Sequence, residues 1–211
     1  DFSYSFYLRG KSVSFVKNEV KLDLGLAQDI YHYAQYVSDS LVTNLGRITY
    51  IDKKQERTFQ NIMLKAKLSY KFSNKVLLDG DFKQIGGGCR ARDYLSGGVL
   101  TLAGGNKTGR VIFEGYAQNN TPALIDSSWI SNHYVFHYHF KNQKTNSLSF
   151  NYINDALALN LKAEYFLISN YIYFKAQPGG IDAKPTQVSA PINLLKLTLS
   201  KNITWRRWHF D

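Results

Sequence analysis

The sequence lacks both the cysteine pairs of small disulfide-linked domains and the long apolar runs of membrane helices. Its 211 residues include one cysteine, Cys89, which excludes a disulfide within the chain. No stretch approaches the roughly 18 consecutive apolar residues of a transmembrane helix. If the protein lies in a membrane, it must cross with strands that close into a barrel, because an open sheet edge leaves backbone groups unpaired in lipid.

Motifs of common catalytic sites are absent as well. No Gly-x-Ser-x-Gly nucleophile elbow occurs, and Gly86-Gly87-Gly88 lacks the Gly-Lys-Ser/Thr ending of a phosphate-binding loop. Asp79 and Asp81 share one face of a predicted strand, as a glycosidase pair would. Lumenal charges that balance the lysines of the preceding strand explain them better. We expect no enzymatic activity and no cofactor.

The most informative feature of the sequence is a long alternation of apolar and polar residues between positions 62 and 72. Successive side chains of a strand point to opposite faces, so this segment has one apolar and one cationic face. Its length approaches the roughly 9–11 residues with which a tilted strand crosses a bilayer. The apolar positions are Ile62, Leu64, Ala66, Leu68, Tyr70 and Phe72, and between them stand Met63, Lys65, Lys67, Ser69 and Lys71.

The alternation recurs along the chain, most clearly in residues 157–167, and it predicts roughly ten to fourteen strands. Short turns alternate with longer loops, as in outer-membrane barrels. Residues 26–46 have helical spacing but no strong cap, so a helix and a loop with a helical turn are equally compatible with them. Residues 177–191 are expected to form an exposed loop. The predicted fold is all-β: an antiparallel transmembrane β-barrel, in a single domain over residues 1–211.

Basic residues exceed acidic ones by 26 to 16, which gives a net charge of +10. They are not clustered in one run, and several alternate with apolar residues on predicted strands. This arrangement favours a barrel lumen or lipid headgroups over a nucleic-acid surface, and a cationic lumen favours anionic solutes. The predicted pore-lining residues are Lys65, Lys67, Lys71, Asp79, Asp81, Lys83, Asn160, Lys162 and Glu164.

Aromatic residues make up 15% of the sequence, with 15 Tyr, 13 Phe and 3 Trp. Rings with a polar tip suit the interface between membrane and water, where one end is apolar and the other hydrated. A girdle of such rings is therefore predicted. Its members are Trp129, Tyr134, Tyr165, Tyr171, Tyr173, Trp205 and Trp208.

Three histidines, His133, His137 and His139, fall on one face of a predicted strand. A His-x-His pair on a strand can reach one metal ion, since imidazole is a common zinc or copper ligand. No acidic or cysteine ligand stands nearby in the sequence. Lumen-facing polar histidines are the better interpretation, and no metal site is predicted.

An ordered series of motifs occupies the C-terminal third. An aromatic-rich strand, Leu161–Phe174, ends in Asn-Tyr-Ile-Tyr-Phe. A loop with Pro185–Gln187 follows, then a leucine-rich strand at Leu194–Leu199 and the aromatic-His ending Trp208–Asp211.

Together these motifs, mainly within residues 129–211, resemble the putative porin family of Bacteroidota outer membranes. The resemblance implies an outer-membrane β-barrel with a poorly defined transport role and no catalytic residues. Family members are usually longer and barrels usually end in an aromatic residue, so an incomplete barrel is expected.

Three functions are compatible with these features. The first is a channel for passive diffusion of small solutes, preferring anions, among the lipid and lipopolysaccharide of the cell outer membrane. The second is a structural or accessory barrel with a plugged lumen in a larger outer-membrane complex, with residues 26–46 or 177–191 as plug or docking surface. The third is a soluble all-β module that binds carbohydrate on Tyr and Trp platforms. No nucleic-acid partner is expected.

Overall fold

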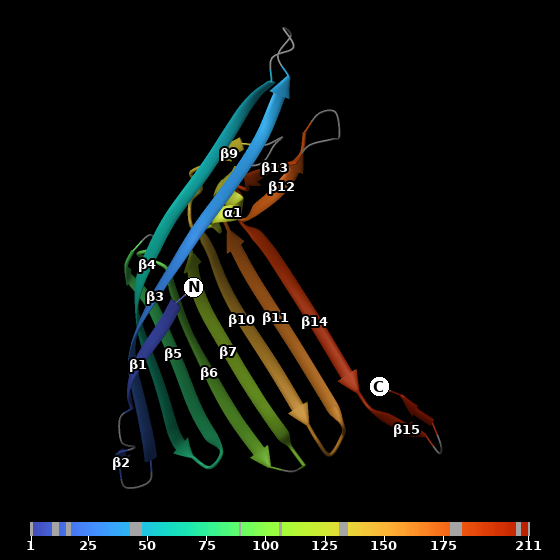
Figure 1. Ribbon diagram of the computed structural model, residues 1–211. Coiled ribbons are helices and arrows are strands. Elements are labelled where there is room, and N and C mark those ends of the chain that lie inside the picture. Colours follow the sequence, from blue (N-terminus) through green and yellow to red (C-terminus); the bar gives the residue numbers. More distant parts are fainter. Residues whose placement is uncertain are drawn as a thin grey trace.

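A computed structural model (Figure 1) describes residues 2–9, 13–15, 18–42, 48–88, 90–105, 107–130, 135–177, 183–205 and 208–210. Side chains are described for residues 20–36, 54, 56–88, 90–105, 107–129, 136–177 and 183–202. Strands dominate this part of the chain. The elements are β1 Phe2–Arg9, β2 Val13–Phe15, β3 Asn18–Val42, β4 Ile48–Ser73, β5 Val76–Gly87, β6 Tyr94–Gly105, β7 Gly109–Asn120, α1 Leu124–Ser127, β8 Ser128–Ile130, β9 Val135–His137, β10 Gln143–Asn154, β11 Leu159–Ser169, β12 Ile172–Ala176, β13 Ala183–Gln187, β14 Ile192–Lys201, β15 Ile203–Trp205 and β16 Trp208–Phe210.

Among the described residues, ten strands form one large sheet. Nine of them follow in the order β1-β3-β4-β5-β6-β7-β10-β11-β14, and β2 pairs with one end of β3. Every neighbouring pair is antiparallel. The prediction of an all-β, antiparallel fold is confirmed.

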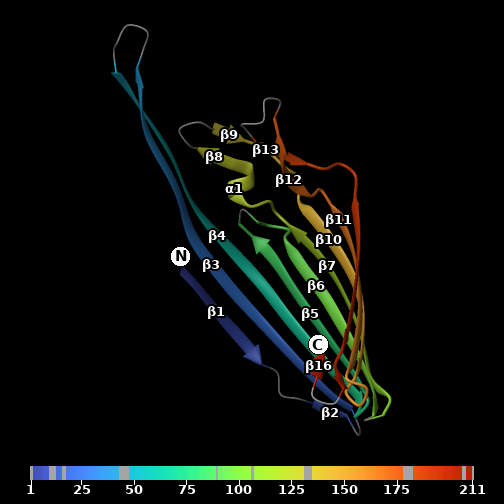
Figure 2. The ribbon, with the colours of Figure 1, turned by 90° about the vertical axis from the view of Figure 1, so that its right-hand side faces the viewer.

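The sheet is curved but open (Figures 1 and 2). β1 and β14 are its edges, and in the described part of the chain they do not pair with each other. Because direction alternates along the nine-strand path, β1 and β14 run the same way. Antiparallel closure between them would need an odd number of additional strands.

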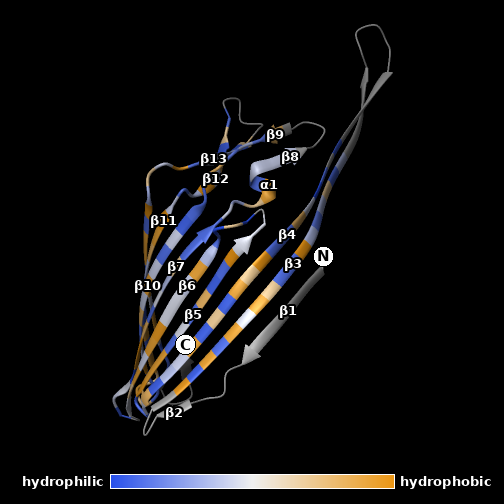
Figure 3. Cartoon of the chain, turned by 90° about the vertical axis from the view of Figure 1, so that its left-hand side faces the viewer, coloured by the Kyte–Doolittle hydropathy of each residue, from blue (hydrophilic) through white to orange (hydrophobic). Residues whose placement is uncertain are grey.

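The register places apolar residues of neighbouring strands on one common face. Cross-strand partners share a face, so each row of partners has one character. Figure 3 shows the resulting alternation of hydrophobic and hydrophilic residues along β3 to β6. One row of the apolar face runs through Leu22, Leu68, Gly80, Gly98, Gly115, Leu148, Tyr165 and Leu195. The adjacent row of the polar face runs through Lys21, Ser69, Asp79, Val99, Glu114, Ser149, Glu164 and Lys196.

The polar face is the concave one. The Tyr33 hydroxyl, on the same face of β3 as Lys21, donates a hydrogen bond of 3.4 Å to the Ser128 carbonyl at the start of β8. Figure 2 shows α1, β8 and β9 between the β3–β4 side of the sheet and the β10–β11 side. The apolar face is therefore convex and faces outward, where Leu197 and Leu199 of β14 are each 69% exposed.

The two ends of the sheet differ in construction (Figure 1). At the lower end, short turns join β4 to β5, β6 to β7 and β10 to β11. At the upper end, the chain leaves the sheet in two longer excursions that carry α1 and the small strand pairs β8–β9 and β12–β13. Their described residues are 121–130 and 135–142 in the first excursion, and 170–177 and 183–191 in the second. The β3–β4 pair also continues far beyond its neighbours on this side.

The prediction of a helical or irregular segment over residues 26–46 is wrong where the structure describes it. β3 has 25 residues and β4 has 26, and they pair continuously from Glu19–Lys71 to Val42–Ile48. The helical spacing of apolar residues there is overridden by cross-strand partners, because pairing decides strand formation more than intrinsic preference does. The strand predicted from the alternation at 62–72 is likewise only the lower part of β4.

Candidate functional site

The concave face of the sheet gathers all nine predicted pore-lining residues. Cross-strand partners on β4 and β5 bring Lys65 opposite Lys83, and Lys67 opposite Asp81. On the opposite side of the sheet, Asn160, Lys162 and Glu164 lie at alternate positions of β11. The residues thus share one face, as the alternation predicted, and whether they line a pore stays a prediction.

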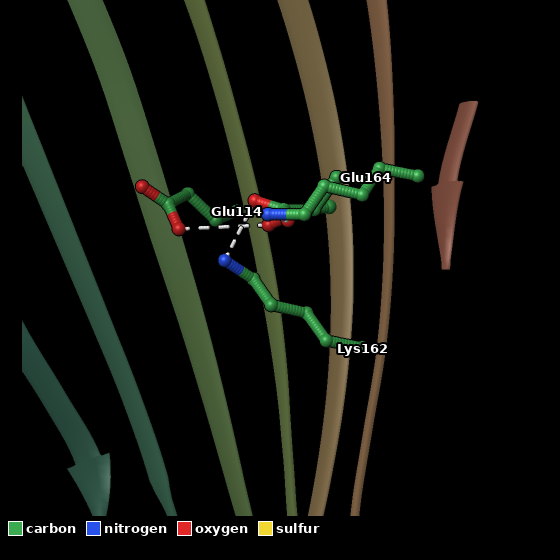
Figure 4. Close-up of polar contacts among 5 residues, drawn as sticks. Glu114, Lys162 and Glu164 are labelled. Atoms are coloured by element: carbon green, nitrogen blue, oxygen red, sulfur yellow. Dashed lines mark hydrogen bonds and ion pairs between the residues drawn. The ribbon is translucent and has the colours of Figure 1, made fainter. Parts of the chain in front are cut away.

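A cluster of charges lies at mid-height of this face (Figure 4). The Glu164 side chain is only 13% exposed and accepts contacts from two ammonium groups. Lys162 Nζ is 2.7 Å from Glu164 Oε1, and Lys196 Nζ is 3.3 Å from Oε2. Beside them, the Ser149 hydroxyl donates to Glu114 Oε2 over 3.5 Å. Three neighbouring strands, β7, β10 and β11, together with β14 build this mixed-charge row.

Of the expected charge pairs between β4 and β5, those of Lys67 and Lys71 with Asp79 and Asp81 do not form direct contacts in the described part of the chain. In the part of the chain with described side chains, Lys67, Lys71 and the two aspartates make no ion pair within 4 Å, although Lys67 and Asp81 are cross-strand partners. Their charges face the concave side individually. A wall of this kind presents separate fixed charges of both signs to whatever lies against it.

A buried carboxylate at the upper end ties two segments to the wall. Asp93, at the start of β6, is 6% exposed. Its Oδ1 accepts hydrogen bonds from the Thr121 backbone N–H and hydroxyl, both at 2.8 Å, and from Asn142 Nδ2 at 3.3 Å. Because Thr121 and Asn142 begin and end the first upper excursion, Asp93 closes that excursion at its base.

The second upper excursion is fastened to the first by amide side chains. Asn170 Nδ2 donates to the Asn142 carbonyl over 2.9 Å. Gln187 Nε2 donates to the carbonyls of Lys141 at 2.7 Å and Asn170 at 3.0 Å. The upper rim is thus a connected polar network rather than a set of independent loops, and such networks restrain loops when every member is satisfied.

The β5–β6 turn folds inward over β4. Gly88 has φ +105°, and a Cβ there would stand 1.9 Å from the Gln60 carbonyl, so only glycine permits this approach. The Arg90 N–H donates to Asn61 Oδ1 over 3.4 Å. A small apolar cluster lies on the same face, formed by Ala27, Met63 and Ile85. The concave side is therefore partly filled near its upper end.

Three groups in the upper extension have shifted pKa values. Burial raises the pKa of Tyr33 above its usual range. The Glu56 carboxyl lies 3.1 Å from His32 Nε2 and pairs with Lys54. The hydrogen bond from Lys54 lowers the pKa of Glu56 and raises that of Lys54.

The predicted aromatic girdle is only partly assembled on the convex face. Tyr165 lies there, 41% exposed, and its hydroxyl donates to Asn193 Oδ1 over 2.6 Å. Tyr171 and Tyr173 are exposed just beyond the upper end of β11. Trp129 belongs to β8, inside the first excursion, and not to the outward face of the sheet. Tyr134 and the side chains of Trp205 and Trp208 lie outside the described part.

The histidine group does not form a metal centre in the described residues. The rings of His137 and His139 contact edge to face, with centroids 4.9 Å apart. His133 lies outside the described residues. Where side chains are described, no group of three or more His, Cys, Asp or Glu residues could hold a metal ion.

The sequence analysis did not identify several residues that organise this face. Glu114 and Lys196 join the mid-height cluster, and Asp93 and Arg90 organise the upper end. Alternation within their strands would have identified the first two. The other two stand in a turn or at a strand start, where no periodic signal exists. Among described residues, no helix has the length and apolar character of a membrane span.

A sheet with one apolar face and one charged face is typical of porin-like β proteins. The family described as putative porin matches residues 2–211, and the chain belongs to this family. The match extends well before residue 129, so the family signal is not confined to the C-terminal third. No curated protein and no solved structure matches the chain.

Proposed function

We propose that the protein is part of an outer-membrane channel for passive diffusion of small solutes in a Gram-negative bacterium, with a preference for anions. The observation that carries the proposal is the two-sidedness of the sheet. Leucines of β14 project outward at 69% exposure, while Glu164 of the next strand projects inward between two lysines. Lipid outside and water inside explain both environments at once.

The construction of the two ends gives an orientation. Outer-membrane barrels have short turns on the periplasmic side and longer loops outside the cell. The lower end, with its short turns, then faces the periplasm. The upper end, with the β3–β4 extension and both excursions, faces the exterior.

Among the described residues β1 and β14 are unpaired edges, and a barrel wall would need further strands between them. Unpaired backbone groups cost several kcal/mol each in lipid, by order of magnitude, so a spanning sheet must close. Because β1 and β14 run the same way, an odd number of antiparallel strands completes the wall.

Conductance in planar bilayers tests the channel. The full-length protein should give stable conductance in KCl, and a KCl gradient should give a reversal potential of the sign expected for anion preference. Cation preference would contradict the selectivity, and a silent membrane would contradict the channel itself. Absence of turnover on chromogenic ester and glycoside substrates is also expected.

The outward position of the apolar face has its own test. Leu197→Arg places a charge on the convex face, where it is expected to destabilise the barrel in lipid vesicles by about 2–4 kcal/mol. Thr198→Arg puts the same charge on the concave face and is the matched control. Equal effects of both variants on urea unfolding would contradict a lipid-facing convex surface.

A second candidate function is an accessory barrel with a closed lumen. The first excursion and the inward β5–β6 turn both lie over the concave face and favour this alternative. Partners that co-purify at fixed stoichiometry in mild detergent, together with a silent bilayer trace, would support it. Lipopolysaccharide and outer-membrane lipid are the expected surroundings in either case.

A further inference from the structure

A hollow on the concave face, just beneath the upper rim, is lined by charged and amide side chains together with Ile85, Tyr94 and Leu95. It measures about 160 Å³ and lies between the upper ends of β5, β6 and β7. Its polar lining comes from Lys83, Arg90, Asp93, Gln118 and Asn120. We propose that this hollow binds small oxyanions, carboxylate or phosphate, at the entrance of the lumen. The proposal rests on the channel function and names its solute class.

The backbone of Arg90 is anchored to β4, and its side chain contacts an aromatic ring of β3. Its guanidinium carbon lies 5.8 Å from the centre of the Tyr31 ring, and its backbone N–H donates to Asn61 Oδ1. Asn61 Nδ2 in turn donates to the Tyr31 hydroxyl over 3.1 Å. A guanidinium fixed in this way retains its planar fork of donors, which fits the geometry of carboxylate and phosphate oxygens.

Lys83 supplies a second positive charge, which no carboxylate among the described side chains pairs with. In the part of the chain with described side chains, its ammonium group makes no hydrogen bond or ion pair. The cross-strand partner of Lys83 is Lys65, another lysine on the same face. The Gln118 and Asn120 amides also have no partner among described side chains and add neutral donors.

The remaining charged group of the hollow is already satisfied. Asp93 Oδ1 accepts three hydrogen bonds from Thr121 and Asn142, which stabilise the carboxylate and hold it at the rim. Cationic groups therefore outnumber the single carboxylate, and the local potential attracts anions. Because Asp93 also fixes the base of the first excursion, the hollow lies where a solute would first leave bulk water.

Block of conductance by inorganic phosphate and by acetate tests the proposal. With the full-length protein in KCl, millimolar phosphate added on the upper side should reduce current, and acetate should do so more weakly if phosphate is the preferred oxyanion. Lys83→Gln and Arg90→Gln should each raise the half-blocking concentration about tenfold, equivalent to about 1.4 kcal/mol. Arg90→Lys keeps the charge but loses the fork and should restore only part of the affinity.

Lys71→Gln is the matched control. It removes one positive charge from the same face near the lower end of β4, away from the hollow, and should leave the half-blocking concentration unchanged. Equal weakening by Lys71→Gln would show that general lumen charge, not this hollow, attracts the oxyanion.

Isothermal titration of phosphate into the detergent-solubilised protein separates the two proposals. Binding that Arg90→Gln abolishes, without any conductance, would retain the hollow and overturn the channel. Conductance without block or binding would retain the channel and overturn the oxyanion site.

Discussion

The lower and upper ends of the sheet each contain a buried polar side chain that connects neighbouring segments by hydrogen bonds. The two ends differ in the kind of segments that are connected. At the lower end, Asn154 is 2% exposed, accepts from the Leu157 N–H at 3.0 Å and donates to the Lys107 carbonyl at 3.1 Å. It joins two short turns to each other. At the upper end, Asp93 joins a turn to a long excursion. The comparison indicates a rigid lower end and an upper end whose arrangement depends on a polar network.

The largest effect is expected from breaking the lower end at a glycine. Gly109 has φ +78°, and an added Cβ would stand 2.4 Å from the Ile153 carbonyl, so Gly109→Ala combines backbone strain with a collision. A loss of about 3 kcal/mol in the free energy of unfolding follows, measured by urea titration in lipid vesicles.

Gly105→Ala is the matched variant at the same turn. Gly105 also has positive φ, +103°, but no atom lies within 4 Å of the added Cβ. Gly105→Ala should lower the free energy of unfolding by about 1 kcal/mol, because it introduces backbone strain without a collision. Equal losses for both glycines would show that the collision with Ile153 does not occur.

The second-largest loss of stability is expected from removing the hydrogen bonds of Asn154 at the lower end. Asn154→Ala leaves the Leu157 N–H and the Lys107 carbonyl without their partner, and it should cost about 2 kcal/mol. Asn146→Ala, an exposed position on the same strand, is the control and should change stability little. An Asn154→Ala variant as stable as wild type would mean that water replaces the side chain at no cost.

The upper polar tie should affect permeability more than stability. Asp93→Ala frees the base of the first excursion, and because the segment is at the rim, global stability should fall by only about 1 kcal/mol. Single-channel current noise should rise as the excursion moves. Asp93→Asn keeps an acceptor oxygen and should behave more like wild type, and Asp126→Ala controls for the loss of charge.

The smallest effect concerns the exposed β3–β4 extension. The ion pair between Glu56 and Lys54 lowers the pKa of the Glu56 carboxyl. The ion pair is therefore fully present above the ordinary carboxyl pKa, and it is lost as the pH falls through the lowered pKa of Glu56. Lys54→Met should move the Glu56 midpoint upward in an NMR titration, without a change in global unfolding. A midpoint that stays low would assign the shift to His32 instead.

The sequence predicted the wall well and the upper end poorly. Alternation in Lys65, Lys67 and Lys71 assigned each side chain to the correct face, because a period of two is a property of the strand itself. Trp129 was predicted to belong to the aromatic girdle and lies in β8, since nothing local reveals that residues 121–130 and 135–142 leave the sheet. Arg90 and Asp93 escaped notice for the same reason: their roles depend on Asn61 and Thr121, which are distant in the chain.

By itself the sequence determined an all-β chain with one apolar and one charged face, because side-chain direction along a strand follows from backbone geometry alone. Only the tertiary structure decided that the charged face is concave, that β1 and β14 are the edges of the sheet in the described residues, and which segments lie across the upper rim. These features depend on curvature and on contacts between residues far apart in the chain, which no local pattern encodes.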